Sequence, residues 1–139
     1  MYRLTQRTLG DLTYQIIGAA IEVHKALGPG LLEQVYESCM AYELRQRGLT
    51  VASQQPVPIS YKGLTMEANL KYDLLIENSI IVEVQSVETM LPIFEIQLLS
   101  YMQLLKKPKG ILLNFHCTNI FKEGQKTLVN ELYRQLPRV

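Results

Sequence analysis

Hydrophobic residues recur at helical spacing over the first third of the chain. Between residues 8 and 27 they follow one another at intervals of three or four, which predicts a helix with one apolar face. The glycines and proline of residues 28–30 end it, because the residue before a proline avoids the helical conformation. A second amphipathic helix is predicted over residues 31–47, with arginines in its last turn and a glycine after it. The expected inward positions are Leu12, Ile16, Ala20, Val23 and Leu27 in the first helix, and Leu32, Val35, Tyr36, Cys39, Met40 and Leu44 in the second.

The middle of the chain changes to the period of two that is typical of strands. Residues 51–61 are extended, and two prolines that cannot donate to a ladder place them at a sheet edge. After a turn, the alternation runs from residue 64 to residue 77 as one long strand with Asp73 on its polar face. A second turn at Asn78 and Ser79 precedes an apolar strand over residues 80–87.

The last third adds a helix over residues 92–105, which begins with Pro92, and a short apolar strand over residues 111–115. The tail is ambiguous: the leucines at 128, 132 and 136 suit a helix, whereas residues 124–129 could form an additional strand. The order is therefore α-α-β-β-β-α-β. It predicts an α/β fold, a small mixed sheet covered by helices, formed by residues 1–139 as a single domain.

Composition agrees with one folded domain. The chain has 139 residues, of which 47% are hydrophobic and 19% charged, so it can bury a core and is not a disordered tail. The formal net charge of +1 gives no global sign of a nucleic-acid or membrane partner. No apolar signal core or membrane-length run occurs, so we expect no membrane association and a cytoplasmic location.

The cysteines and histidines do not suggest a metal or nucleophile site. Cys39 and Cys117 form no disulfide framework or zinc spacing, and Cys39 is expected to be a core thiol. His24 and His116 lie far apart in sequence and are expected on a helix surface and in a loop. Glycine-rich phosphate loops and serine-hydrolase elbows are absent from the sequence.

A carboxylate and an amide interrupt the apolar strand at residues 80–87. Glu83 and Gln85 share one face of it, since side chains two apart point the same way. If the preceding turn is a three-residue loop centred on Asn78, Asp73 lies opposite Glu83 with Cβ atoms roughly 4.5–5.5 Å apart. Two opposed carboxylates repel one another unless a cation neutralises them, which favours a Mg²⁺ or Mn²⁺ site. A wet sheet margin, or a carboxyl that takes up a proton, would explain the pair equally simply.

Residues Gly30-Leu31-Leu32-Glu33-Gln34-Val35-Tyr36 carry the pattern GxxExxY. This pattern and several other spaced motifs resemble those of the GxxExxY family of small bacterial proteins, from about residue 17 to residue 115 and on towards the end. The other matches are Gly28, Tyr61-Lys62-Gly63, Asp73-Leu74-Leu75, Ile81-Val82-Glu83, Gln97 to Tyr101 and Asn114-Phe115. This family is placed in the PD-(D/E)XK nuclease-like superfamily. The resemblance implies an α-β-β-β-α-β core, which agrees with the element order above.

The resemblance also implies a set of site residues. Asp73 and Glu83 would be the metal-binding acids, and Glu33 a helix acid that reaches the same metal directly or through water; on its own, Glu33 would be a solvated helix charge. Tyr36 is then a packing or supporting residue. Gln97 and Tyr101 are neighbours on one helix face and resemble the QxxxY element of helicase-associated exonucleases, although Tyr101 could equally be a core aromatic residue.

Two positions depart from the superfamily pattern. Gln85 stands where a lysine is expected two residues after the strand acid, and Phe94 stands where the family often has histidine. A glutamine can hold a water but brings no positive charge, and loss of such a stabiliser commonly costs on the order of 10²–10³ in rate. Gln85 could reflect tolerance in an active enzyme, natural loss of catalysis, or a deliberate Lys→Gln change.

The resulting expectation is a Mg²⁺- or Mn²⁺-dependent nuclease that acts on DNA rather than RNA. Asp73, Glu83 and Gln85 would be catalytic. The loop lysines Lys106, Lys107 and Lys109 could contact a phosphate backbone or simply solubilise the loop. The alternatives are a catalytically inactive module that binds nucleic acid or protein, and an oligomeric structural protein. A homodimer would enlarge any basic surface.

Overall fold

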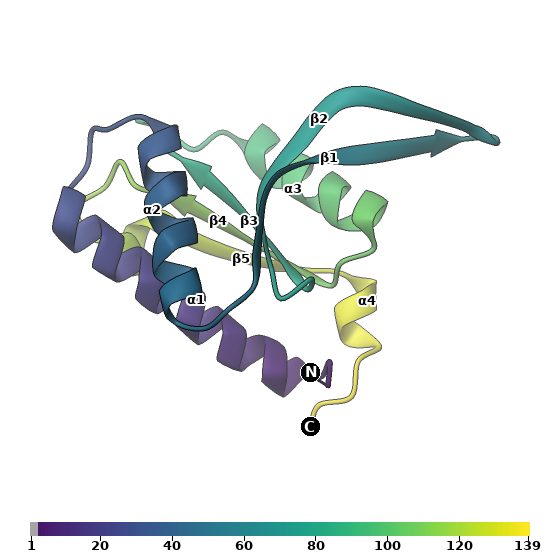
Figure 1. The fold of residues 1–139 in the computed structure, drawn as a ribbon, viewed down its shortest axis with the longest axis horizontal. Helices are drawn as coiled ribbons and strands as arrows, with labels where there is room; N and C mark the ends of the chain where they lie inside the picture. The colour runs from purple at the N-terminus through teal and green to yellow at the C-terminus, as the bar shows by residue number, and fades with distance from the viewer. Residues whose placement is uncertain (1–2) are drawn as a thin grey trace.

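The central sheet has five strands that follow one another in chain order, β1-β2-β3-β4-β5 (Figure 1). The computed structural model describes residues 3–139. All neighbouring strands pair antiparallel except β3 and β4, which are parallel because helix α3 crosses between them. The strands are β1 Val51–Tyr61, β2 Leu64–Ile76, β3 Ile80–Gln85, β4 Lys109–Asn114 and β5 Gln125–Val129. The helices are α1 Gln6–Leu27, α2 Glu33–Gln46, α3 Pro92–Leu105, a π-helical turn Ile120–Gly124 and α4 Glu131–Arg134.

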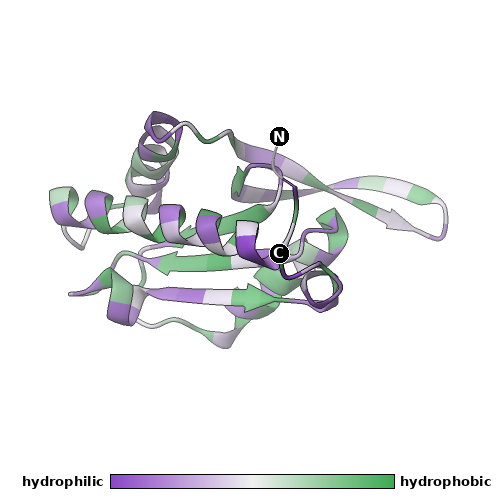
Figure 2. Cartoon of the chain, turned by 90° about the horizontal axis from the view of Figure 1, so that it is seen from below, coloured by the Kyte–Doolittle hydropathy of each residue, from purple (hydrophilic) through white to green (hydrophobic). Residues whose placement is uncertain are grey.

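Helices cover both faces of the sheet, so the core has two layers. On one face, α1 and α2 pack against Leu74, Val82 and Ile111, together with other apolar residues of the central strands. On the other face, α3 packs against a smaller cluster that includes Ile81 and Leu112. Figure 2 shows hydrophobic residues along the central strands and mixed stripes along the helices. The predicted mixed sheet covered by helices is confirmed.

Some predicted boundaries and inward positions are wrong by a few residues. Helix α1 begins before residue 8 because Thr5 and Thr8 form a capping box at its start. Helix α2 begins at Glu33, so Leu32 precedes it and is 73% exposed. Leu27 and Val35 are also exposed rather than inward, since they lie at the ends of helices next to the glycine loop. Cys39 is half-buried against the core.

Strand β3 ends at Gln85 rather than at residue 87. The Ser86 hydroxyl donates a hydrogen bond to the Leu31 carbonyl over 2.6 Å, which ties this segment to the loop before α2. The Asn114 side chain then accepts a hydrogen bond from the Val87 N–H and donates one to the Val87 carbonyl. At the tail, the additional strand is the correct alternative, as β5, and only the short α4 follows it.

The β1–β2 hairpin leaves the sheet and projects beyond α3 (Figure 1). We call residues 55–72 the arm. Near the sheet, Ile76 and Val51 face α1 and α2, whereas in the arm Val57 and Tyr72 face α3. The side chains therefore change from one face of the sheet to the other at position 54 in β1 and at position 73 in β2. The prediction of one uninterrupted alternation from residue 64 to residue 77 is wrong for this reason. A two-stranded hairpin is only marginally stable by itself and gains stability by packing against a helix, but α3 covers only the root of the arm.

Across residues 3–139, no helix combines the length and the apolar character that a membrane crossing requires.

Candidate functional site

Asp73 and Glu83 meet where β2 and β3 separate. The observed pairs Leu74↔Val82, Leu75↔Ile81 and Ile76↔Ile80 have the predicted register, and the next position in it joins Asp73 to Glu83. The backbone N–H of Asp73 donates to Glu83 Oε2 over 2.7 Å, and that of Val84 donates to Asp73 Oδ2 over 2.8 Å. Each carboxylate thus binds the backbone of the opposite strand in place of the next ladder bonds.

Burial and mutual repulsion control the charge of this pair. Glu83 is only 6% exposed, and burial together with the Asp73 charge raises its pKa to about 9. Burial also raises the pKa of Asp73, while its hydrogen bonds from Val84, Glu83 and Gln54 act in the opposite direction. Burial and mutual repulsion therefore favour one retained proton on the pair near neutral pH.

Helix α2 brings two glutamates to the same side. Glu33 is exposed at the start of the helix; partial burial and the Asp73 charge raise its pKa, and the backbone N–H of Ser86 lowers it. Glu37 lies one turn further along and is half-buried, with its pKa raised by burial and by the charges of Asp73 and Glu33. The charge of Glu37, rather than that of Glu33, also acts on Glu83.

Gln54 connects the helix to the strand pair. Its Nε2 donates to Glu37 Oε1 over 2.7 Å and to Asp73 Oδ1 over 3.1 Å. Sequence reasoning missed both Glu37 and Gln54. Glu37 could have been found from its spacing of four from Glu33, which puts the two on one helix face. Gln54 gives no such signal, because a glutamine in an edge strand looks like a solvated residue.

Tyr36 is buried behind the site rather than inside it. Its hydroxyl donates to the Gly28 carbonyl over 2.5 Å and accepts from the Leu31 N–H over 3.1 Å. Its ring stacks on Phe115 with centroids 4.4 Å apart. Tyr36 thereby fixes the loop that leads into α2 and to Glu33.

The other predicted residues lie around the acid pair. Gln85 is half-buried at the end of β3, two residues beyond Glu83. Tyr101 of α3 is 5% exposed, and burial together with the charges of Glu83 and Asp73 raises its pKa, so its phenol lies within the field of the acids. Gln97 is exposed one turn earlier on the same helix face. Phe94 is half-buried against the α3-side core.

The basic loop lies at the other end of the strands. Lys109 begins β4 opposite Ile80, which is about 10 Å along the strand from Glu83. It is 6% exposed, with Nζ 5.6 Å from the centroid of the Tyr133 ring, and burial lowers its pKa. Lys107 Nζ donates to Asn78 Oδ1 over 3.0 Å, and Lys106 is the exposed left-handed residue that ends α3. The structure therefore does not bring these lysines to the acid pair.

His24 contacts the loop after β4 rather than the acid pair. His24 Nε2 lies 2.9 Å from the carbonyl oxygen of Cys117, and the His24 ring contacts Phe115 at a centroid distance of 6.1 Å. The Cys117 thiol itself donates to the Asn114 carbonyl. His24 thus joins α1 to the loop after β4.

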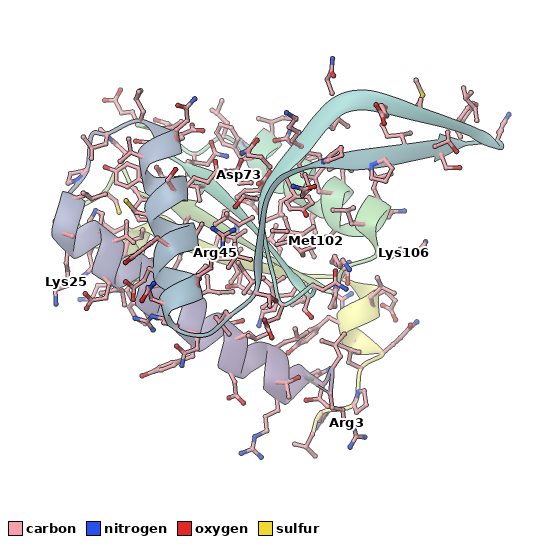
Figure 3. The ribbon with its side chains drawn as sticks, in the orientation of Figure 1. Arg3, Lys25, Arg45, Asp73, Met102 and Lys106 are labelled. Carbon is pink, nitrogen blue, oxygen red and sulfur yellow. The ribbon has the colours of Figure 1, made fainter. Side chains whose placement is uncertain are left out.

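The donor set at the acid pair fits a hard divalent cation only in part. Among residues 3–139, no three histidine, cysteine, aspartate or glutamate side chains are arranged to hold a metal ion together, so Glu33 does not complete a cage with Asp73 and Glu83. Mg²⁺, however, is usually held by one or two carboxylates, with water and phosphate oxygens at its other positions. Two opposed carboxylates at a sheet opening match that chemistry. Figure 3 shows Asp73 at this opening, where the hairpin leaves the sheet.

Comparison with known protein families agrees with the fold. A sequence model of the PD-(D/E)XK nuclease superfamily matches residues 10–128, and the chain belongs to this superfamily. The match runs from α1 into β5 and includes every residue of the site described above. Searches of curated proteins and of solved structures give no match.

The protonated state of Glu83 gives a first prediction. Folded Glu83 keeps its proton up to about pH 9, whereas the unfolded chain loses it near the ordinary value of 4.5. The free energy of unfolding of the metal-free protein should therefore fall as pH rises between these values, by up to about 1.4 kcal/mol per pH unit. Glu83→Gln, which imitates the protonated form, should flatten this dependence in urea unfolding with a chelator present. Parallel pH profiles for the two proteins would contradict the assignment.

Proposed function

We propose that this protein is a Mg²⁺- or Mn²⁺-dependent nuclease that hydrolyses phosphodiester bonds of DNA in the cytoplasm. The observation that carries the proposal is the Asp73–Glu83 pair, opposed at the opening between β2 and β3 in a member of a nuclease superfamily. We place the protein in the GxxExxY family, on the signature from Gly30 to Tyr36, and assign residues 1–139 to one nuclease-like domain.

The roles of the residues follow from their positions. Asp73 and Glu83 would hold the metal, and the exposed Glu33 would reach it through water. Once bound, the divalent ion would polarise the phosphate and lower the pKa of its water. Gln85, two residues after Glu83 at the strand end, would orient the attacking water as a neutral donor and acceptor. Gln97 and Tyr101 would support the site from α3.

Metal binding is the first test of this proposal. Mn²⁺ should stabilise the folded protein, by about 2.7 kcal/mol at a free concentration one hundred times its dissociation constant. Asp73→Asn should abolish this effect, because the neutral side chain keeps the bond from the Val84 N–H but loses the charge that attracts the ion. Thermal unfolding with and without Mn²⁺ measures both. Equal stabilisation of the wild type and Asp73→Asn by Mn²⁺ would refute the metal site. A separate assay of cleavage of single- and double-stranded DNA and RNA then tests the substrate.

The alternative function is a metal-binding module without catalysis. The specific observation that favours it is Gln85, which brings no charge to the position of the superfamily lysine. On this alternative, Mn²⁺ binds but no nucleic acid is cut.

Restoring the missing cation tests whether the scaffold is competent for catalysis. Gln85→Lys should raise the cleavage rate by on the order of 10²–10³ if a positive charge at this position stabilises the transition state. The charge-neutral control Gln85→Met has about the same length and should not gain activity. Cleavage of a labelled duplex under single-turnover conditions measures the change. A scaffold that has lost catalysis altogether would show no gain with lysine.

A homodimer is also proposed, through the arm. The register Ile59↔Met66 and Tyr61↔Leu64 puts these four side chains on the face that carries Val57, and the last three residues are 44–61% exposed. Val57 and these four residues are uncharged, although Lys62 Nζ lies 5.4 Å from the centroid of the Tyr61 ring and puts one positive charge at the edge of this face. With the exposed isoleucines of the neighbouring α3, two copies would bury on the order of 1,000 Å² in total, the size of a specific interface.

The dimer is tested by changing one face of the arm at a time. Leu64→Glu should convert the protein to a monomer in light scattering, because it places two charges in the proposed interface. Thr65→Glu, next to it on the opposite face, is the matched control and should leave the dimer intact. A monomeric wild-type protein, or an equal effect of both variants, would contradict the interface.

A further inference from the structure

Gln54 has a backbone conformation that a strand residue does not normally adopt. Its φ is 50°, in the left-handed region that residues other than glycine, asparagine and aspartate seldom occupy. The pairs on either side, Ser53↔Leu74 and Gln55↔Tyr72, keep the same register, so no residue is inserted. Gln54 and Asp73, which would pair between them, are left out of the ladder.

In this backbone conformation the side chain of Gln54 contacts two carboxylates. As described above, its amide bridges Glu37 of α2 and Asp73 of β2. Asp73 Oδ1 therefore binds Gln54, and Asp73 Oδ2 binds the Val84 N–H, so both carboxylate oxygens are fixed. Strained residues that persist at a site indicate a role that the relaxed conformation would not fill.

We propose that Gln54 is a positioning residue for the metal ligand Asp73, and that Glu37 anchors Gln54. The inference rests on the proposed function, in which Asp73 holds a divalent ion. Hydrogen bonds from residues behind a metal ligand fix its orientation, and their loss typically weakens metal binding by about 10–100-fold. A glutamine suits this position because one amide can donate two hydrogen bonds. A glutamate there would add a third negative charge between Glu37 and Asp73.

The metal-free protein provides the first measurement. Gln54→Gly permits the left-handed backbone but removes the amide, and Lys62→Gly, at φ 47° in the hairpin turn, is the matched control for backbone relaxation. Loss of the bridge should free the Asp73 carboxylate and accelerate hydrogen exchange of the Val84 N–H by about tenfold. Lys62→Gly should leave that rate unchanged. If Val84 exchanges equally slowly in both variants, Gln54 does not position Asp73.

Mn²⁺ titration provides the second measurement. Gln54→Gly should weaken Mn²⁺ binding by about 10–100-fold relative to Lys62→Gly. Glu37→Ala should weaken it more than Glu37→Gln, since both remove the charge but only glutamine can still accept the bond from Gln54. A change of less than twofold in Gln54→Gly, or equal effects of the two Glu37 variants, would overturn the inference. If wild type does not bind Mn²⁺ but Val84 exchange still accelerates, the positioning of Asp73 stands and the proposed metal function fails.

Discussion

The exchange of hydrogen bonds between Asp73 and Glu83 decides how the rest of this molecule is arranged. Where the ladder between β2 and β3 stops, each carboxylate takes a backbone N–H of the other strand. Those bonds satisfy groups that would otherwise be buried without partners, and they hold two acids close together at the price of a retained proton. The retained proton relieves the repulsion between the two carboxyl groups, and in the proposed function a divalent ion would take over that role.

The strands around this pair form a rigid support. All residues of β4 and all but the last of β3 are buried, because α1 and α2 cover one face and α3 the other. Such double coverage is typical of parallel strands. The site lies where this support ends: the arm begins on one side, and Ser86 and Asn114 hold the chain after β3 on the other.

Sequence reasoning recovered the elements whose apolar pattern is unambiguous and the register that depends on them. The Asp73–Glu83 pairing followed from the turn around Asn78 and from the requirement that apolar residues stay on buried faces. It could not recover Gln54, because a left-handed glutamine costs about 1–2 kcal/mol and is retained only through tertiary contacts with α2. The exchange of faces in the arm, the early end of β3 at Gln85 and the burial of Lys109 depend on such contacts too.

The charges around the site define what the proposed metal ion would have to do. Lys107 binds Asn78 and Lys109 is buried beside Tyr133, so neither is placed to neutralise charge that develops on a phosphate near Glu83. Gln85 offers only a neutral dipole, and Glu33 and Glu37 add negative potential from α2. A bound divalent ion would have to balance this acidic field and the phosphate together. In the proposed function, a positive charge at position 85 would oppose this acidic field two residues from Glu83, where a neutral glutamine cannot.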